Sequence, residues 1–366
     1  MSDPVSNWVL HDYLQVNGGA ERLVTTLVRG MPDWGLAVSG IYPEFSSSAE
    51  LTGVHCRVVA EWARRFPRIP RALLAFGAGT RITDGAKRVV YSGVYAPLDV
   101  KHQVAGLKVL YCHTPPRFAF DWQERYLRRY PGVTRPLLKL LIETYRESYL
   151  EALRAMDLVV TNSNHVRRRL FELTGVDSSV IYPPIATRQF CFTGQSGYYL
   201  SVARLEPAKR VDRIIRAFLS MPDLQLIVTS GGSEFERLKA IANGAPNIHF
   251  THWVSDSTLA YLMGQAIATL YIPEDEDFGM SAVESMSAGK PVIGVNEGGL
   301  AETVIDCKTG FLLEADPTTE SIQDAIKKMT PKVAMSMQYA CQHRAAEFST
   351  ERFLEGFQRL LDLQIY

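Results

Sequence analysis

The sequence is poor in cysteine and has no long apolar run, and each shortage excludes a class of protein. Its 5 cysteines are scattered along 366 residues, and none stands in a CxxC pair. An odd, scattered set favours a reducing compartment and argues against a disulfide framework or a structural zinc site. No apolar run approaches the about 18 residues of a membrane-spanning helix. The N-terminal MSDPVSN also lacks the charged-then-apolar pattern of a signal peptide.

An excess of one charge is missing as well. The 39 Lys and Arg residues balance 39 Asp and Glu residues, and 46% of the chain is hydrophobic. These values are those of an ordinary soluble globular protein, and no basic motif interleaved with aromatic residues indicates nucleic acid. We therefore expect a cytoplasmic protein without a membrane span, and we leave open a peripheral contact with the inner face of the membrane.

The chain is longer than one usual hydrophobic core, so two domains are expected. A strand, a glycine loop and a helix follow one another at 8–29, and a similar succession recurs at 199–218. Such units open doubly wound α/β domains with a parallel sheet. The rigid Pro183-Pro184 turn and the loop after it predict the boundary. We expect an N-terminal domain at 1–187 and a C-terminal domain at 188–349, followed by a helix within 350–366.

The most informative stretch is EDFGMSAVESMSAGKPVIGVNEGG, at 276–299. It follows an apolar, strand-like run, and a helical pattern begins at Met280. The backbone N–H groups of Met280 and Ser281 at this helix start suit a phosphate. Glu276 and Glu284 can accept hydrogen bonds from sugar hydroxyls. The combination predicts a nucleotide-sugar site at the carboxyl ends of parallel strands.

Seven residues separate Glu276 from Glu284, with Phe278-Gly279 after the first Glu and an Ala-Gly-Lys-Pro-Val turn after the second. Together with Gly298-Gly299, this spacing resembles the signature of retaining glycosyltransferases of family 4, which have the GT-B fold. The alternative is a capped, solvated helix in an unrelated α/β domain, which leaves Glu284 harder to explain.

The resemblance implies two Rossmann-like, doubly wound parallel-sheet domains that face a cleft, with the C-terminal helix packing back on the first domain. The nucleotide sugar would bind mainly to the second domain and the acceptor mainly to the first. Glu284 would hold the ribose hydroxyls, and Glu276 a hydroxyl of the donor sugar. One departure is Ser285, where the family more often has Ala, and it puts only the fine fit of the ribose contact in doubt.

Two cations follow the first predicted strand of the second domain. Arg204 and Lys209 lie in a strand-to-helix loop, where positive charge can stabilise a diphosphate leaving group. In family 4 the Arg and Lys of this spacing perform that role, and the alternative is solvated loop charge. The resemblance also implies that Gly231 lies on the donor side and that the loop of Val254 supports the nucleobase. The predicted donor-binding residues are Gly18, Gly19, Arg204, Lys209, Gly231, Val254, Glu276, Phe278, Gly279, Met280, Ser281 and Glu284.

The segment HTPPR follows a predicted strand, so His113 lies at the same kind of carboxyl edge as Glu276. Followed by Phe120-Asp121, it resembles the segment of bacterial family 4 mannosyltransferases whose histidine faces the donor sugar. Arg117 is either an acceptor contact or half of a surface ion pair. The predicted catalytic residues are His113, Glu276, Arg204 and Lys209.

The N-terminal loop offers further candidates. His11 and Asp12 either line the acceptor cleft or form a satisfied strand-end pair. Gly18-Gly19 fits the family loop that lies against the donor pyrophosphate or the acceptor, although a glycine pair is as often a flexible turn. The predicted acceptor-binding residues are His11, Asp12 and Arg117.

A metal site is considered at Asp275, Glu276 and Asp277, which form the DxD pattern by which other glycosyltransferases hold a divalent cation. Because Arg204 and Lys209 already neutralise the diphosphate, we expect no metal and no other cofactor.

The segments HDY, HTPPR, YPP and EDFG together resemble bacterial GDP-mannose-dependent mannosyltransferases of polysaccharide and O-antigen synthesis. The resemblance implies transfer of mannose from GDP-mannose to a lipid-linked saccharide acceptor. Three alternatives stay open: a family 4 transferase with a UDP-sugar donor, a GT-B-like UDP-sugar epimerase, and a non-catalytic subunit that binds nucleotide sugar.

Two further stretches are rich in apolar side chains. At 62–76 four arginines crowd around aromatic and aliphatic side chains, as in a peripheral protein on an anionic membrane. The alternative is a surface helix whose aromatic residues face the core. At 137–156, Leu137, Leu140, Leu141 and Tyr145 recur at helical spacing, which predicts core packing.

Overall fold

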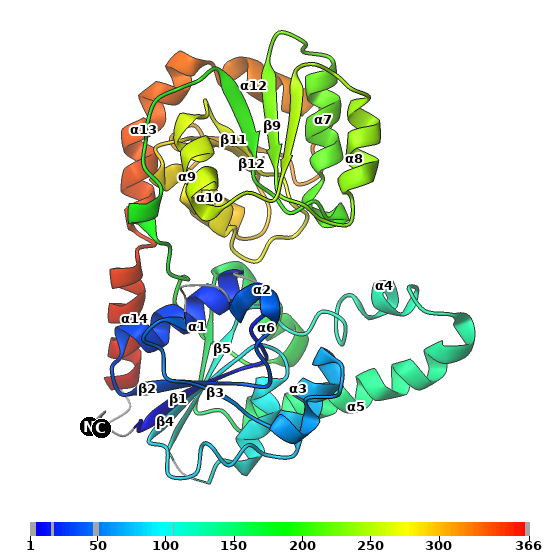
Figure 1. Cartoon of the computed structure of the whole chain (residues 1–366), viewed down its shortest axis with the longest axis vertical. Helices are drawn as coiled ribbons and strands as arrows, with labels where there is room; N and C mark the ends of the chain where they lie inside the picture. Colours follow the sequence, from blue (N-terminus) through cyan, green and yellow to red (C-terminus); the bar gives the residue numbers. More distant parts are fainter. Residues whose placement is uncertain (1–4, 16–17, 47–50, 105, 363–366) are drawn as a thin grey trace. The chain divides into compact units, whose positions relative to one another are not determined.

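The computed structural model describes residues 5–15, 18–46, 51–104 and 106–362. The chain divides into two compact units, residues 1–183 with 356–366 and residues 184–355. Each unit is a parallel sheet covered by helices (Figure 1). The two doubly wound α/β domains expected from the sequence are therefore present, and the division falls between Pro183 and Pro184.

Unit 1 contains a sheet of seven parallel strands in the order β3-β2-β1-β4-β5-β6-β7. The strands are β1 Asn7–His11, β2 Trp34–Val38, β3 Cys56–Val58, β4 Arg88–Ser92, β5 Leu107–Cys112, β6 Leu158–Thr161 and β7 Ser179–Val180. The strand order reverses between β1 and β4, and ligand crevices form at such switch points, outside the carboxyl ends of the strands.

The helices of unit 1 cover this sheet. They are α1 Gly19–Gly30, α2 Pro43–Ser46, η2 Glu61–Ala63, α3 Arg68–Gly77, η3 Ala96–His102, α4 Gln123–Leu127, η4 Gly132–Thr134, α5 Arg135–Arg154 and α6 Asn164–Thr174. As expected from the periodicity, α1 buries Leu23, Val24 and Leu27. Burying such a stripe is the main contribution of an amphipathic helix to stability.

The prediction for the start of α5 is wrong. Tyr145 and Tyr149 are buried in the core, but Leu137, Leu140 and Leu141 are 63%, 59% and 57% exposed. Figure 1 gives the reason: the N-terminal half of α5 extends beyond the layer that covers the sheet of its own unit. The apolar stripe of the helix therefore continues beyond the end of the hydrophobic core.

The stretch 62–76 agrees in part with each of the two interpretations of the sequence. Trp62 and Phe66 are 64% and 48% exposed, whereas Phe76 is buried. Arg71 is buried as well, while Arg64 and Arg65 are exposed. The two aromatic residues nearest the arginine pair therefore do not face the core.

Unit 2 contains a sheet of six parallel strands in the order β10-β9-β8-β11-β12-β13. The strands are β8 Tyr198–Ser201, β9 Gln225–Thr229, β10 Ile248–His252, β11 Thr269–Leu270, β12 Val292–Val295 and β13 Gly310–Leu313. The helices are η5 Thr187–Gln189, η6 Pro207–Lys209, α7 Val211–Leu219, α8 Phe235–Ala242, α9 Asp256–Gln265, α10 Met280–Ser287, α11 Leu300–Thr303, α12 Thr319–Lys328 and α13 Pro331–Ala346. The strand order reverses between β8 and β11, which creates a second switch point.

The last helix, α14 Thr350–Asp362, begins in unit 2 and ends in unit 1. Within unit 1, Phe357 is fully buried, with its ring centroid 6.5 Å from that of Tyr111. The C-terminal helix therefore packs on the first domain, as expected.

The segment after the Pro183-Pro184 turn is fastened to unit 2. The Ser287 hydroxyl donates to the Thr187 carbonyl oxygen at 2.7 Å. The Lys290 ammonium donates to the Gly194 carbonyl oxygen and lies 4.0 Å from the centre of the Phe192 ring. Burial lowers the pKa of Lys290 to about 8. The turn after α10 thus holds this segment as part of unit 2.

Across the described ranges, no helix combines the length and the apolar character needed to cross a bilayer.

The Tyr199 hydroxyl offers a test of the packing in unit 2. It donates to the carbonyl oxygens of Met329 at 2.8 Å and Ile326 at 3.4 Å, where it joins β8 to the end of α12. Tyr199→Phe leaves these buried carbonyl groups without that donor, so we expect the free energy of unfolding to fall by about 1–2 kcal/mol. The matched control is Tyr261→Phe at an exposed position, where we expect a change within about 0.5 kcal/mol. Equal losses in urea titrations of the two variants would contradict this role.

Candidate active site

An ion pair between Lys209 and Glu276 stands at the switch point of unit 2. The Lys209 ammonium contacts the Glu276 carboxylate and donates to the Tyr271 hydroxyl at 3.1 Å. The Tyr271 hydroxyl donates to the same Glu276 oxygen at 2.9 Å. Lys209 follows β8 and Glu276 follows β11, which are neighbouring strands. Two of the four predicted catalytic residues are therefore in direct contact.

Arg204 and Glu284 lie around the same tyrosine. Burial raises the pKa of Tyr271, the negative charges of Glu276 and Glu284 raise it further, and the positive charge of Arg204 lowers it. Glu284 is buried on α10, whereas Arg204 is exposed. The four charged residues that the sequence predicted for the donor site thus all act on Tyr271, Lys209 and Glu276 through direct contacts and Arg204 and Glu284 through their charges, and they are called the charged cluster.

The loop before α10 reaches this cluster in a conformation that requires glycine. Gly279 has φ +87° and caps α10, which begins at Met280 as expected. A Cβ at Gly279 would overlap the side chain of Leu300. Phe278 is buried, while Met280 and Ser281 are partly exposed at the start of the helix. The first N–H groups of α10 therefore lie next to a loop that carries Glu276, and helix N-termini attract anions.

The Gly298-Gly299 pair explains how the Glu276 loop is held. The Gly299 N–H donates to the Glu276 carbonyl oxygen at 2.7 Å. A Cβ at Gly298 would overlap the Glu276 backbone, and one at Gly299 would overlap the backbone of Asp277 and Phe278. The two glycines let one loop backbone lie directly against the other.

Ser285 has a role different from the one considered for it. Its hydroxyl is buried and lies 2.7 Å from the Thr269 hydroxyl, and it donates to the Lys290 carbonyl oxygen at 3.1 Å. Ser285 therefore connects α10 to β11 in the interior of unit 2. An alanine at this position could not form these hydrogen bonds.

Gly231 and Val254 belong to the loops after β9 and β10. The Gly231 carbonyl oxygen accepts from the Leu205 N–H at 3.0 Å, beside Arg204. A Cβ on Gly231 would overlap the ring of Trp253, which is 59% exposed, and Val254 is partly exposed. These loops thus adjoin the Arg204 loop at the same edge of the sheet.

In unit 1, His11 and His113 are joined through Ser92. The Ser92 hydroxyl lies 3.0 Å from His11 Nδ1 and 2.8 Å from His113 Nε2. Burial lowers the pKa of His11 to about 4 and that of His113 to about 3. Both imidazoles are therefore neutral near pH 7. Ser92 was missed in the sequence, although it ends β4 directly before a glycine.

The two histidines line a cavity of about 180 Å³ at the carboxyl ends of β1, β4 and β5. Ala20 and Glu21, in the first turn of α1, line it too. Gly18 caps α1 and Gly19 is its first residue. The residues that line the cavity are His11, Asp12, Tyr13, Ala20, Glu21, Gly93, Val94, His113 and Thr114.

Asp12 combines a place in this cavity with a structural role. Its carboxylate accepts from the backbone N–H groups of Val94, Tyr95 and Ala96 at 2.8 Å each. Gly93, with φ +105°, leaves no room for a Cβ beside the carboxylate. Burial raises the pKa of Asp12 to about 6, and the three backbone hydrogen bonds oppose that rise. The alternative of a satisfied strand-end group therefore describes Asp12 well.

Arg117 is engaged within its own segment. Its guanidinium contacts the Asp121 carboxylate at 2.8 Å and lies 3.5 Å from the centre of the Trp122 ring. This geometry fits the ion-pair alternative. Behind the same segment, the Asn162 amide donates to the His113 carbonyl oxygen at 2.9 Å. The neighbouring Ser163 side chain caps α6.

The DxD pattern at 275–277 lies on the loop that carries Glu276. One oxygen of the Glu276 carboxylate accepts from Lys209 and Tyr271. The Asp275 N–H donates to Glu297, at 3.2 Å. Among the residues that the structure describes, no group of three or more His, Cys, Asp or Glu side chains could hold a metal ion.

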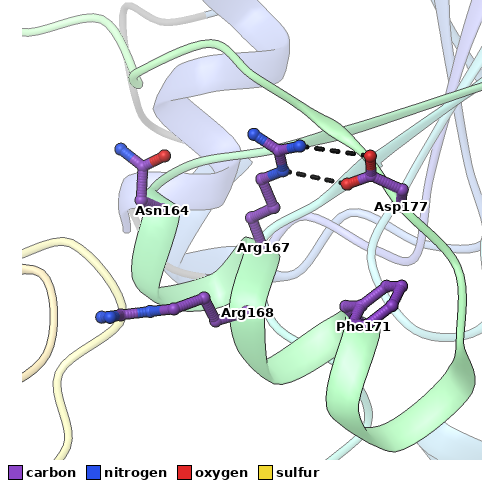
Figure 2. A pocket seen from close by; sticks show the side chains of 5 residues that line it. All are labelled: Asn164, Arg167, Arg168, Phe171 and Asp177. Carbon is purple, nitrogen blue, oxygen red and sulfur yellow. Dashed lines mark hydrogen bonds and ion pairs between the residues drawn. The ribbon is translucent and has the colours of Figure 1, made fainter.

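A larger recess of about 390 Å³ lies on α6 and the loop after it. Figure 2 shows Arg167 pointing to Asp177, which it contacts through two hydrogen bonds of 2.9 and 3.1 Å. Asn164, Arg168 and Phe171 complete the lining. None of the residues predicted for the donor or acceptor lies in this recess.

Two family models match the chain. The model described as "Glycosyltransferase Family 4" matches residues 17–189, and the one described as "Glycosyl transferases group 1" matches residues 188–340. Together they cover the Lys209–Glu276 ion pair of unit 2 and, in unit 1, Ser92 and His113, whereas His11 and Asp12 precede the matched residues.

Curated relatives and solved structures agree with these matches. The α-1,3/1,6-mannosyltransferase ALG2 of Homo sapiens is 26% identical over 96% of this chain and 94% of its own length. The GDP-mannose-dependent α-mannosyltransferase of Mycolicibacterium smegmatis is 31% identical over 31% of this chain and 30% of its own. Sucrose-phosphate synthase from Thermosynechococcus elongatus has a TM-score of 0.76 at 17% identity, covering 98% of this chain and 99% of that one.

A further solved structure, Anabaena Alr3699/HepE in complex with UDP and glucose, has a TM-score of 0.72 at 16% identity and covers 97% of this chain and 99% of that one. At these identities the solved structures establish the fold alone, which is GT-B. With the two family models and the Lys209–Glu276 cluster, the conclusion is that this chain belongs to the family 4 glycosyltransferases and is a glycosyltransferase of GT-B fold.

Proposed function

We propose that this glycosyltransferase transfers mannose from GDP-mannose to a lipid-linked saccharide acceptor in bacterial surface polysaccharide synthesis, with retention of anomeric configuration. The observation that carries the proposal is the cluster of Arg204, Lys209, Glu276 and Glu284 around Tyr271. Such a cluster offers cations to a diphosphate and carboxylates to hydroxyl groups. The mannosyltransferase names among the curated relatives support the choice of sugar.

The diphosphate would be held by Arg204, Lys209 and the first N–H groups of α10. As the bond to the sugar breaks, negative charge grows on the leaving phosphate oxygen, and fixed cations stabilise that charge without reorganising. Because Lys209 is already positioned by Glu276 and Tyr271, little conformational freedom is lost when the donor binds.

The two glutamates would bind the neutral parts of the donor. Glu276 accepts from Lys209 and Tyr271 through one oxygen, Oε2, and a carboxylate has further lone pairs to offer a sugar hydroxyl. Glu284, buried on the first turns of α10, would hold the ribose hydroxyls. We propose a same-face reaction in which the leaving phosphate oxygen takes the proton of the acceptor hydroxyl.

The cavity in unit 1 would receive hydroxyl groups of the reacting sugars. His11 and His113 are neutral, so each imidazole carries one donor and one acceptor nitrogen. Ser92 fixes both rings through one hydrogen bond to each. We propose His113 as the group that contacts the transferred sugar and Ser92 as the residue that positions it.

No metal is proposed in this reaction, since the cation pair supplies the charge that a divalent ion would supply. We further propose that the protein works on the cytoplasmic side of the membrane, where a nucleotide-sugar donor and the lipid-linked acceptor would meet.

Nucleotide release tests the function directly. The protein is incubated with GDP-mannose or UDP-glucose, with and without a lipid-pyrophosphate saccharide, and the product is examined for its anomeric configuration. We expect acceptor-dependent release of GDP and an α-linked mannoside, with full activity in chelator. A preference for UDP-glucose would overturn the proposal that GDP-mannose is the donor. Free sugar products without acceptor would indicate an epimerase. Binding without turnover would indicate a non-catalytic subunit. Loss of activity in chelator that Mn²⁺ restores overturns metal independence.

Substitutions in the charged cluster test the proposed roles. Lys209→Ala and Glu276→Ala each remove a group aimed at the leaving diphosphate or the sugar, so we expect kcat/KM to fall by about 10²–10³-fold. The matched controls are Lys239→Ala and Glu236→Gln on α8, whose side chains are exposed. These should keep near-normal activity. Near-normal activity in either cluster variant, with folding verified by circular dichroism, would count against these roles.

The neutral state of His113 predicts a pH dependence of stability. Its pKa is about 3 in the folded protein against 6.5 in the unfolded chain, so unfolding takes up a proton below pH 6.5. The stability of unit 1 therefore falls as the pH drops through that window. His113→Asn removes this uptake, so between pH 7.5 and 5 we expect the variant to gain about 1–2 kcal/mol relative to the wild type. Parallel stability curves in urea titrations would show that His113 is not held neutral.

A further inference from the structure

A stretch of unit 1 presents apolar side chains to solvent in an ordered conformation. It comprises α4, η4 and the start of α5, residues 123–141, and is called the arm here. Figure 1 shows α4 and the N-terminal half of α5 projecting from the rest of unit 1. All residues at 128–137 are exposed. The exposed apolar side chains are Tyr130 at 39%, Val133 at 89%, Leu137 at 63%, Leu140 at 59% and Leu141 at 57%.

Hydrogen bonds and buried side chains hold the arm in its conformation. The Arg135 guanidinium donates to the carbonyl oxygens of Tyr130 at 2.9 Å and Arg128 at 3.5 Å, which closes the turn between the two helices. The hydroxyls of Tyr126 and Tyr130 lie 3.1 Å apart. At the base of the arm, Leu127 and Ile142 are buried in the core of unit 1. The exposure of the leucines is therefore set by the fold itself.

The charges of the arm are nearly all positive. Residues 123–141 hold five basic side chains, Arg125, Arg128, Arg129, Arg135 and Lys139, and one acidic side chain, Glu124. An apolar ridge between cations is the surface that anionic lipid attracts, since the cations reach headgroups while the aliphatic side chains enter the acyl boundary. Tyr130 at the edge of the ridge has the amphipathic ring that favours this boundary.

A second copy of this chain and a different protein partner both fit the arm less well. A second copy of the arm would bring five cations against five, and like charges across an interface oppose association. A stable protein interface takes about 800 Å² from each partner, and four partly exposed aliphatic side chains supply only a fraction of that area.

We propose that the arm docks unit 1 on an anionic lipid bilayer, with Val133, Leu137, Leu140 and Leu141 inserted and the flanking cations on the headgroups. The docking does not depend on which sugar is transferred or on any residue of the active site. It assigns membrane contact to the arm rather than to the exposed Trp62 and Phe66 of the stretch 62–76.

Vesicle co-sedimentation of the full chain tests the proposal, with phosphatidylcholine alone or with about 30 mol % phosphatidylglycerol. We expect binding to the anionic vesicles, weakened between about 0.1 and 0.5 M salt. The triple variant Leu137→Ser, Leu140→Ser, Leu141→Ser should bind at least about tenfold more weakly. The variant Arg128→Gln, Arg129→Gln, Lys139→Gln should lose the salt dependence along with most of the binding.

Matched controls are Met335→Ser with Tyr339→Ser on α13 for exposed apolar side chains, and Lys327→Gln with Lys328→Gln on α12 for charge. Both should bind like the wild type, and circular dichroism should show that every variant is folded. Binding that survives in the leucine variant but is lost in Trp62→Ser, Phe66→Ser overturns the assignment to the arm. Equal affinity for neutral and anionic vesicles would overturn the proposal that the arm prefers anionic lipid. Concentration-dependent self-association that the leucine substitutions abolish, without vesicle binding, identifies a second copy instead.

Discussion

The ion pair between Lys209 and Glu276 connects two loops that follow neighbouring strands of unit 2. The loop after β8 contributes the cation and the loop after β11 the carboxylate, and their strands are neighbours at the switch point. Both side chains are about four-fifths buried, at 19% and 18% exposure. Partly desolvated charges are stable only when they are paired and hydrogen-bonded. The Tyr271 hydroxyl supplies the additional hydrogen bonds, so the charges are fixed before any ligand arrives.

This arrangement makes steric demands on the surrounding backbone. The Glu276 loop must pass so close to the start of α11 that only glycine fits at Gly298 and Gly299. On the other side, Gly279 takes a left-handed conformation to turn the chain into α10. A side chain at any of these three glycines would displace the loop that holds Glu276. The position of Glu276 therefore requires glycine at all three.

Much of this could be predicted from the sequence because it is local. The start of α10 at Met280, the strand after it and the cations after β8 all follow from periodicity and turn residues within a few positions. Tyr271 and Ser92 were missed because their roles depend on partners from other strands, which spacing along one segment does not reveal. The exposure of Leu137 and Leu141 was also missed. They share a helical stripe with the buried Tyr145 and Tyr149, and periodicity cannot tell where a core ends along a helix.

The two units offer opposite electrostatic environments. In unit 2 the Lys209 ammonium and the Glu276 carboxylate form an ion pair beside Tyr271, an arrangement that would suit the proposed diphosphate. In unit 1, burial leaves His11 and His113 neutral, while Asp12 directs its carboxylate to three backbone N–H groups. A cavity lined this way suits hydroxyl groups, because neutral imidazoles can both donate and accept without attracting a phosphate. The cavity of unit 1 therefore suits the hydroxyl groups of the proposed sugars, whereas the cations of unit 2 suit the proposed diphosphate.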